Sequence, residues 1–140
     1  MAVALDTSAL VEMERALSRG EAPSILPDEP VVIPAIVWAE ALVGARLAAG
    51  PARAARRRAH LEAIRLHAQI VPFTPEIAEH YADIYAELST TGLLIPQSDM
   101  AVAATCRALE CGILVGPNDE EHFSRVAGLR VHTISATGNG

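Results

Sequence analysis

The sequence predicts a three-layer α/β/α fold, with helices on both faces of a parallel sheet of roughly five strands. Three observations favour this class. Short apolar runs recur along the chain and are continuous rather than alternating, as in strands that are buried on both faces. Longer segments with helical periodicity separate these runs, which is typical of parallel strands joined by helical crossovers. The 140 residues, of which 51% are hydrophobic, suit a single domain with one core.

The first half of the chain contains three predicted strands and the helices between them. The strands are short apolar runs at residues 3–5, 31–34 and 69–73. Apolar residues three or four positions apart predict helices, and we expect these at 8–17, 21–26, 35–49 and 52–67. Gly20 ends the first helix, and the composition of 27–30 predicts a loop. Gly50 and Pro51 separate the last two helices, which therefore form a hairpin over 35–67.

The second half contains the strongest helix signals, at residues 74–92. Thr74 is a typical N-cap, Pro75 suits the first helical position, and Gly92 suits the C-terminal end. The remaining predicted elements are a loop at 93–97, a helix over 98–112 closed by Gly112, a strand at 113–116, a turn or short helix at 118–123 and a strand at 129–134. We expect the single domain to span residues 1–134, and residues 135–140 to form a loose tail.

Composition restricts the cellular compartment and the binding partners that we expect for this protein. No apolar run approaches the ~20 residues of a membrane span, and no signal peptide pattern is visible, so we expect a cytoplasmic protein without a membrane partner. Cys106 and Cys111, which we place on one helix, match neither a zinc pair nor a redox pair and are expected to be buried free thiols. The net charge of −6 does not suggest a sequence-independent DNA coat.

Positive charge is nevertheless concentrated locally. All 11 basic residues are arginines, and four of them lie within 53–58. The segment is either a solvated helix face or a contact for nucleic acid or an acidic partner; arginine binds phosphate bidentately, whereas lysine acts as a point charge. His60 and His67 are expected on the surface near this cluster, and the five histidines show no metal-binding spacing.

Four acids stand at predicted strand ends or on predominantly apolar helix faces. Asp6 follows the first strand and Asp119 follows the fourth. Asp99 opens a helix whose inward face carries apolar residues three, four and seven positions later. Glu40 shares a helix face with apolar and small neighbours, so we expect it to be buried. In open α/β sheets, ligands bind beyond the carboxyl ends of the strands, and acids at those ends are therefore the candidate functional residues.

Each acid by itself has a structural explanation. Asp6 and Asp119 suit the caps of the helices that follow them, and Asp99 suits the positive end of its helix, with Ser98 as the cap. A buried Glu40 without a partner would be costly. A shared divalent cation accounts for all four, because converging carboxylates otherwise repel one another. Mg²⁺ or Mn²⁺ prefers oxygen ligands and bridges to phosphate, so phosphodiester hydrolysis is the natural chemistry.

Three stretches of the sequence carry a family resemblance. They are "LDTSALV" near the start, "WAEALVGA" after the second strand, and "IPQSDMAVAATCRALECGILVGPNDEEHFSRVAGLRV" near the end. In order, spacing and flanking residues they resemble the PIN-domain nucleases, in particular the VapC toxins of bacterial and archaeal toxin–antitoxin pairs. The resemblance covers nearly the whole chain and implies a Mg²⁺-dependent endoribonuclease, with Mn²⁺ as a substitute metal.

The resemblance also assigns roles to residues. The family's four acids match, in chain order, Asp6, Glu40, Asp99 and Asp119. It implies that Asp6 and Asp99 bind the metal directly, and that the other two bind through water or position the attacking water. The hydroxyl beside the first acid is Thr7 or Ser8. The spacing to Phe123 favours Asp119 as the fourth acid, with Asn118 and Glu120 as alternatives.

The implied partners are an RNA substrate, a small VapB-like antitoxin and a second copy of the chain in a homodimer. The hairpin over 35–67 lies where the family contacts RNA or antitoxin, which singles out Arg46, Arg53, Arg56, Arg57 and Arg58. Two other functions remain open. A phosphatase of the haloacid dehalogenase type also has an aspartate after its first strand, but its second aspartate would stand where this chain has Ser8. A non-catalytic module on the same fold would bind no metal.

Overall fold

A computed structural model describes residues 2–20, 28–117 and 120–134. Its centre is a five-stranded parallel sheet in the order β3-β2-β1-β4-β5, which confirms the predicted fold class. The strands are β1 (Val3–Leu5), β2 (Val31–Pro34), β3 (Ala68–Val71), β4 (Gly112–Val115) and β5 (Val131–Thr133). The helices are α1 (Thr7–Ser18), α2 (Ala35–Arg46), α3 (Pro51–Arg65), α4 (Pro75–Thr91), α5 (Gln97–Leu109) and α6 (Glu120–Ser124).

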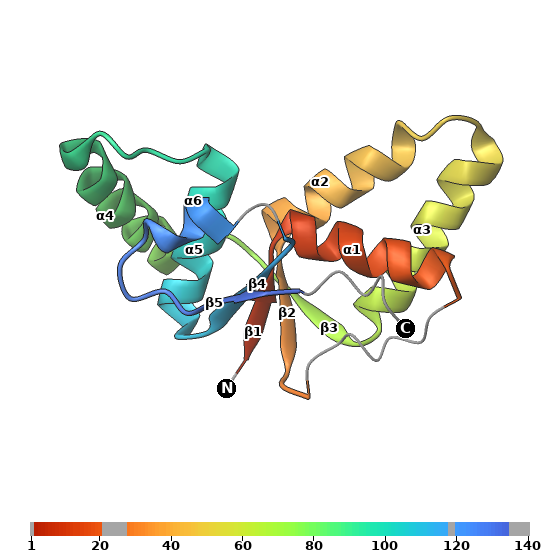
Figure 1. Ribbon diagram of the computed structural model, residues 1–140, viewed down its shortest axis with the longest axis horizontal. Coiled ribbons are helices and arrows are strands. Elements are labelled where there is room, and N and C mark those ends of the chain that lie inside the picture. Colours follow the sequence, from red (N-terminus) through yellow and green to blue (C-terminus); the bar gives the residue numbers. More distant parts are fainter. Residues whose placement is uncertain (1, 21–27, 118–119, 135–140) are drawn as a thin grey trace.

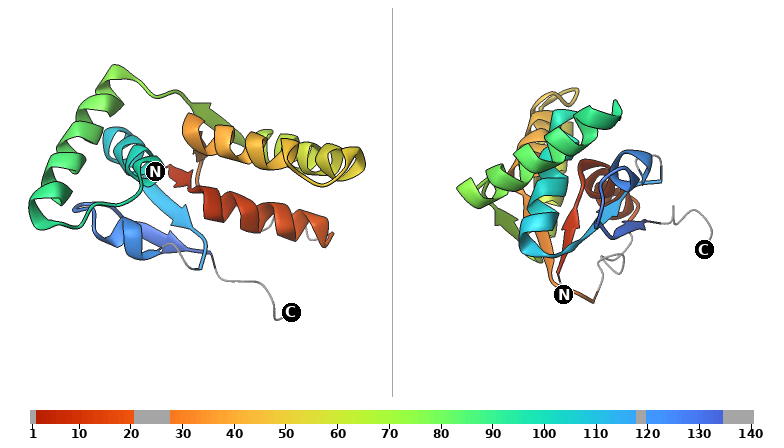
Figure 2. Two further views of the ribbon diagram at one scale, coloured as in Figure 1. Left: turned by 90° about the horizontal axis from the view of Figure 1, so that it is seen from above. Right: turned by 90° about the vertical axis from the view of Figure 1, so that its left-hand side faces the viewer.

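The helices form the two outer layers of the fold (Figure 1). Helices α1, α2 and α3 cover one face of the sheet, and α4, α5 and α6 cover the other, as the view from above in Figure 2 also shows. The three central strands β1, β2 and β4 are buried along their whole length, whereas the edge strands β3 and β5 are partly exposed. Continuous apolar runs therefore mark the strands that are covered on both faces.

Most predicted elements are present, with changes at their ends. Thr74 caps α4 by accepting from the Ile77 N–H at 3.2 Å, and Gly92 closes it in the left-handed conformation, both as predicted. The hairpin of α2 and α3 is present, although α2 ends at Arg46 rather than at residue 49. The last strand spans only Val131–Thr133. The short helix predicted at 21–26 and the tail at 135–140 lie outside the described residues.

The predicted end of α5 at Gly112 is wrong, because the helix stops at Leu109. Glu110 adopts the left-handed conformation (φ 53°) that glycine usually supplies, and the Cys111 N–H bonds back to the Cys106 carbonyl at 3.0 Å. Gly112 instead opens β4. Cys111 therefore lies between helix and strand, not on the helix with Cys106. Both cysteines are free and buried, as expected.

The strand order positions the functional site. The chain winds outward from β1 through β2 to β3, and then returns to place β4 on the other side of β1. The direction of winding therefore reverses between β1 and β4, and such switch points leave a crevice at the carboxyl ends of the strands. Asp6 follows β1 and Gly116 follows β4 at this point. In the part of the chain that the structure describes, no helix is long and apolar enough to cross a membrane.

Candidate active site

Asp6 stands at the switch point and is almost fully buried, with 3% of its surface exposed. Its N–H donates to the Leu114 carbonyl of β4 at 3.0 Å, which extends the pairing of β1 and β4 by one residue. Its carboxylate accepts from the Ser8 N–H at 3.4 Å and from the Ser8 hydroxyl at 2.7 Å. Asp6 therefore caps α1, as expected, and the same carboxylate stands at the edge of the sheet where ligands bind in this class of fold.

Ser8 connects Asp6 to the turn after β4. Its Oγ donates to Asp6 Oδ2 and accepts from the Gly116 N–H at 2.8 Å. Gly116 packs so closely on α1 that an added Cβ would lie 3.0 Å from Ser8 Cβ and 3.1 Å from the Ser8 carbonyl oxygen. The absence of a side chain at Gly116 thus lets the backbone after β4 pack directly against Ser8 of α1.

Glu40 is exposed, so the prediction that it is buried is wrong. Helix α2 buries Val37, Trp38 and Ala41, and Glu40 lies outside that face. A partner distant in sequence holds it nevertheless, because the Thr7 hydroxyl donates to Glu40 Oε1 at 3.0 Å. Since Thr7 directly follows Asp6, this bond places the start of α1 and the middle of α2 at the same end of the sheet.

Asp99 lies in the first turn of α5 and is partly buried. The cap of this helix is Pro96, which contributes no side-chain hydrogen bond, so the prediction that Ser98 is the cap is wrong. Asp99 Oδ2 lies 2.8 Å from His122 Nδ1, a hydrogen-bonding distance. His122 was not among the predicted site residues. The one signal in the sequence is its place just before Phe123, which is fully buried and anchors α6.

The elements that carry these acids touch one another. Helix α5 contacts both β1 and α2. A hydrogen bond with Cys111 and burial raise the pKa of the Cys106 thiol, and the negative charge of Asp6 raises it further. Cys106 lies seven residues after Asp99, on the same face of α5. The charge of Asp6 therefore reaches the face of α5 that carries Asp99.

The described acids do not by themselves form a cation site. Within residues 2–20, 28–117 and 120–134, no three His, Cys, Asp or Glu side chains lie close enough to hold a metal ion. Asp119 and its alternative Asn118 lie outside these ranges. The other alternative, Glu120, is exposed and accepts from the Thr133 hydroxyl of β5 at 3.2 Å. The donor set itself consists of carboxylate and hydroxyl oxygens, which are the ligands of a hard cation.

The arginines predicted to contact RNA or antitoxin have different environments. Arg57 is half-buried, and its Nε bonds Glu14 at 3.1 Å while its Nη1 donates to the Gly44 carbonyl at 2.7 Å. Arg58 forms an exposed ion pair with Glu62 at 2.8 Å. Arg46 and Arg58 line a cavity of about 200 Å³ beside α2. The remaining two of the set, Arg53 and Arg56, lie on the side of α3 that faces α1.

Fold and site together define a doubly wound α/β protein with carboxylates at its topological switch point. The PIN domain family matches residues 3–129, nearly the whole chain. The chain therefore belongs to the PIN domain family, which confirms the resemblance seen in the sequence.

Individual relatives agree with this assignment. Ribonuclease VapC2 of Haemophilus influenzae is 38% identical over 61 residues, which are 44% of this chain and 45% of that protein. The chain thus spans about half the length of the curated relatives it matches. VapBC2 of Rickettsia felis, bound to a promoter DNA fragment, superposes with a TM-score of 0.80 at 18% identity, covering 96% of this chain and 100% of that chain. FitAcB of Neisseria gonorrhoeae superposes with a TM-score of 0.73 at 26% identity, covering 92% and 95%.

Proposed function

We propose that this protein is a Mg²⁺-dependent endoribonuclease and the toxin of a VapBC-type toxin–antitoxin system. The observation that carries the proposal is the buried Asp6 carboxylate at the switch point, with Glu40 tied to its neighbour Thr7. Membership of the PIN domain family supports a nuclease over a phosphatase of the haloacid dehalogenase type. The partial match to proteins named Ribonuclease VapC supports RNA as the substrate.

In this proposal Asp6 and Asp99 bind the metal directly, and Glu40 and Asp119 act through water. When bound, Mg²⁺ or Mn²⁺ would lower the pKa of a water molecule and offset the charge of the scissile phosphate. The donor set fits such an ion, because all four side chains offer carboxylate oxygens. Asp119 is needed to complete the site, since the described acids alone do not form a metal cluster.

Three neighbours act as positioning residues for these acids. Ser8 holds one carboxylate oxygen of Asp6 at 2.7 Å, and Thr7 holds one of Glu40 at 3.0 Å. His122 holds one of Asp99 at 2.8 Å. Fixing carboxylates before a cation arrives lowers the ordering cost of binding, as outer-shell partners do in metal sites.

The proposed partners are a VapB-like antitoxin and a second copy of the chain. Support comes from the solved relatives, several of which are described as VapBC complexes. Co-purification with the product of a neighbouring short reading frame, followed by measurement of the molar mass in solution, tests both. A cytoplasmic location fits this assignment.

Cleavage of total RNA tests the proposed activity. We expect wild-type protein to cut RNA on addition of Mg²⁺ or Mn²⁺ and to stop when EDTA is added. The double variant Asp6→Asn/Asp99→Asn is expected to lose more than about a hundredfold in rate, because it removes both direct ligands. The matched control is Asp28→Asn/Asp83→Asn, which removes two exposed aspartates elsewhere and is expected to cleave normally. Equal cleavage by both double variants would contradict the site assignment.

Calorimetry separates the nuclease from the non-catalytic alternative. We expect Mg²⁺ or Mn²⁺ to bind the wild-type protein with measurable heat, and we expect Asp119→Asn to weaken that binding. A protein on this fold that serves only as an interaction module would take up no metal under the same conditions.

A further inference from the structure

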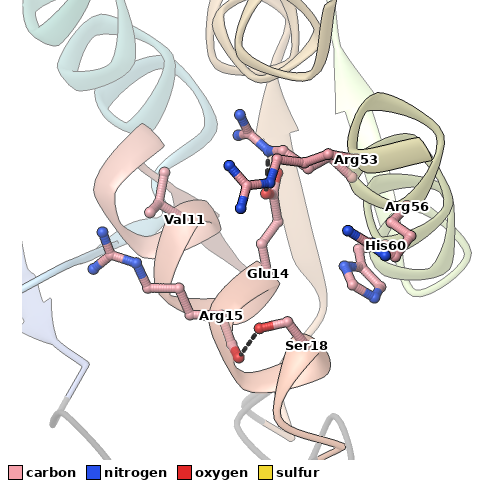
Figure 3. Close-up of a pocket in the computed structure, with 8 residues that line it drawn as sticks. Val11, Glu14, Arg15, Ser18, Arg53, Arg56 and His60 are labelled. Carbon is pink, nitrogen blue, oxygen red and sulfur yellow. Dashed lines mark hydrogen bonds and ion pairs between the residues drawn. The ribbon is translucent and has the colours of Figure 1, made fainter. Parts of the chain in front are cut away.

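A cavity of about 460 Å³ lies between α1 and α3, away from the acids of the proposed active site. Helix α1 contributes Val11, Glu14 and Ser18 to its wall, and α3 contributes Arg53, Arg56 and His60. Figure 3 shows the side chain of Arg53 extending from α3 toward Glu14, with Arg56 and His60 on the same side of α3. We refer to this cavity as the arginine pocket.

The arginine pocket has an excess of positive charge in a chain whose net charge is −6. Of the described residues that line it, Glu14 is the one acid, and the ion pair with Arg57 at 3.1 Å already offsets that charge. Among the residues that the structure describes, neither Arg53 nor Arg56 has an ion-pair partner. Two guanidinium groups thus border the cavity with donors available for an anion.

The pocket lies along the helix that begins at the active site. Thr7, Val11, Glu14 and Ser18 follow one another at spacings of four, three and four residues, so they share one face of α1. The first of them bonds Glu40, and the other three line the pocket. Thr7 and Ser18 are eleven residues apart along the helix, or roughly 16 Å at ~1.5 Å per residue.

Helix α2 connects Glu40 to the pocket through Arg57 of α3. Glu40 and Gly44 lie one turn apart on α2, and the Gly44 carbonyl accepts from Arg57 of α3. Arg57 of α3 therefore connects α1 and α2 beside the pocket. Because these bonds occupy its guanidinium, we assign it a structural role and not a role in binding an anion. The face of α1 that carries Thr7 therefore reaches the arginine pocket directly, and the face of α2 that carries Glu40 reaches it through Arg57.

We infer that the arginine pocket is a phosphate subsite for the RNA strand, in which Arg53, Arg56 and His60 contact backbone phosphates remote from the scissile bond. The inference rests on the proposed ribonuclease function. The shared face of α1 favours an RNA strand over an acidic polypeptide, because a strand held at Asp6 and Glu40 would run on along Val11 to the pocket. Guanidinium groups bind phosphate oxygens bidentately, and such contacts hold a strand irrespective of its bases.

RNA binding in EDTA tests this subsite without any need for cleavage. The probe is a fluorescein-labelled single-stranded oligoribonucleotide, followed by anisotropy over a series of salt concentrations. We expect Arg53→Gln/Arg56→Gln to weaken binding about tenfold at low salt, because phosphate contacts dominate affinity there. The slope of log K against log salt should fall in magnitude by about 0.7 for each phosphate that the variant no longer neutralises.

The matched control is Arg107→Gln/Arg130→Gln. It removes the same two charges, but from α5 and from the residue before β5, away from the helices α1 and α3 that line the pocket. We expect its affinity and salt slope to stay close to wild type, and thermal unfolding of both variants confirms that they are folded. Equal decreases in affinity for the two double variants would show that net charge alone governs binding and would overturn the subsite. An acidic peptide that binds through Arg53 and Arg56, with RNA binding unchanged, would also overturn it.

Cleavage kinetics in Mg²⁺ distinguish this inference from the proposed function. On a long RNA, Arg53→Gln/Arg56→Gln should raise KM with little change in kcat, and on an oligonucleotide too short to reach the pocket it should change neither. If the wild-type protein cleaves RNA and the variant matches it on the long substrate, the subsite is wrong and the nuclease stands. If the wild-type protein cleaves no RNA but binding in EDTA depends on the pocket, the nuclease fails and the phosphate subsite stands.

Discussion

Ser8 connects two segments that lie 108 residues apart in sequence. Its hydroxyl has one donor and this is used by Asp6, while one of its lone pairs accepts from Gly116. Both partners are at the switch point, where Asp6 is buried and a Cβ at Gly116 would lie only 3.0 Å from Ser8 Cβ. A single hydroxyl thereby holds the first proposed metal ligand next to the residue that follows β4.

Ser8→Ala should lower the free energy of unfolding by about 1–3 kcal/mol, because the Gly116 N–H and one Asp6 oxygen then lack the Ser8 hydroxyl in a part-buried site. Urea unfolding measures this. Ser18→Ala is the control, since the Ser18 hydroxyl is exposed and, among the described residues, bonds only the Arg15 carbonyl of its own helix. If Ser8→Ala lowers the free energy of unfolding no more than Ser18→Ala does, the hydrogen bonds of Ser8 add nothing to stability.

At the scale of the helices, the ion pair of Glu14 and Arg57 connects α1 to the hairpin of α2 and α3. The Glu14 side chain is only 9% exposed, and the Arg57 guanidinium at 3.1 Å supplies the opposite charge that a buried carboxylate needs. Arg57 also reaches the Gly44 carbonyl of α2, and an added Cβ at Gly44 would lie 3.0 Å from its Nη2. Arg57 therefore connects the hairpin to α1, in addition to the Thr7–Glu40 bond and the packing of α1 on α2 and α3.

Arg57→Met should destabilise the protein by roughly 1–3 kcal/mol, less than for a fully buried pair because the Arg57 side chain is 32% exposed. Adding Glu14→Leu should restore much of the stability, because no buried charge is then left alone. Chemical unfolding of the two single variants and the double variant gives the coupling energy. Arg58→Met is the control, because its ion pair with Glu62 is exposed on both sides. Additive effects of Glu14→Leu and Arg57→Met would argue against a coupled pair.

Across the molecule as a whole, the winding of the chain brings distant acids to one edge of the sheet. Asp6 follows β1, Glu40 lies on α2 and Asp99 opens α5, so each comes from a different crossover. Because β1 lies between β2 and β4, the elements on both sides of it converge at its carboxyl end. A cation bound there would link the helices of one face of the sheet to those of the other.

Metal binding at this edge should therefore raise the thermal stability of the whole domain. A ligand that binds only the folded state adds about 2.7 kcal/mol at a hundred times its Kd, which is a shift of several degrees for a chain of this length. We expect Mg²⁺ or Mn²⁺ to raise Tm in differential scanning fluorimetry and Asp6→Asn/Asp99→Asn to abolish the rise. An equal rise in wild type and variant would place the metal elsewhere.

Local sequence was sufficient to predict most elements and the position of Asp6 at the carboxyl end of β1. Continuous apolar runs identified β1, β2 and β4 because these strands are buried on both faces, and Thr74 and Gly92 marked the ends of α4 because caps are local chemistry. Asp6 stood out for the same reason, as a charge directly after a buried strand.

Only the tertiary structure shows which residues that are distant in sequence contact one another. The pairs Thr7–Glu40 and Asp99–His122 are separated by 33 and 23 residues, and the Arg57–Glu14 pair by 43, so no local pattern encodes them. The exposure of Glu40 was missed because periodicity gives the apolar face of a helix but not how far a neighbouring layer covers it. The left-handed Glu110 ended α5 where the sequence shows no glycine. Contacts between distant segments depend on the order of the strands, and strand order follows from the packing of the whole chain.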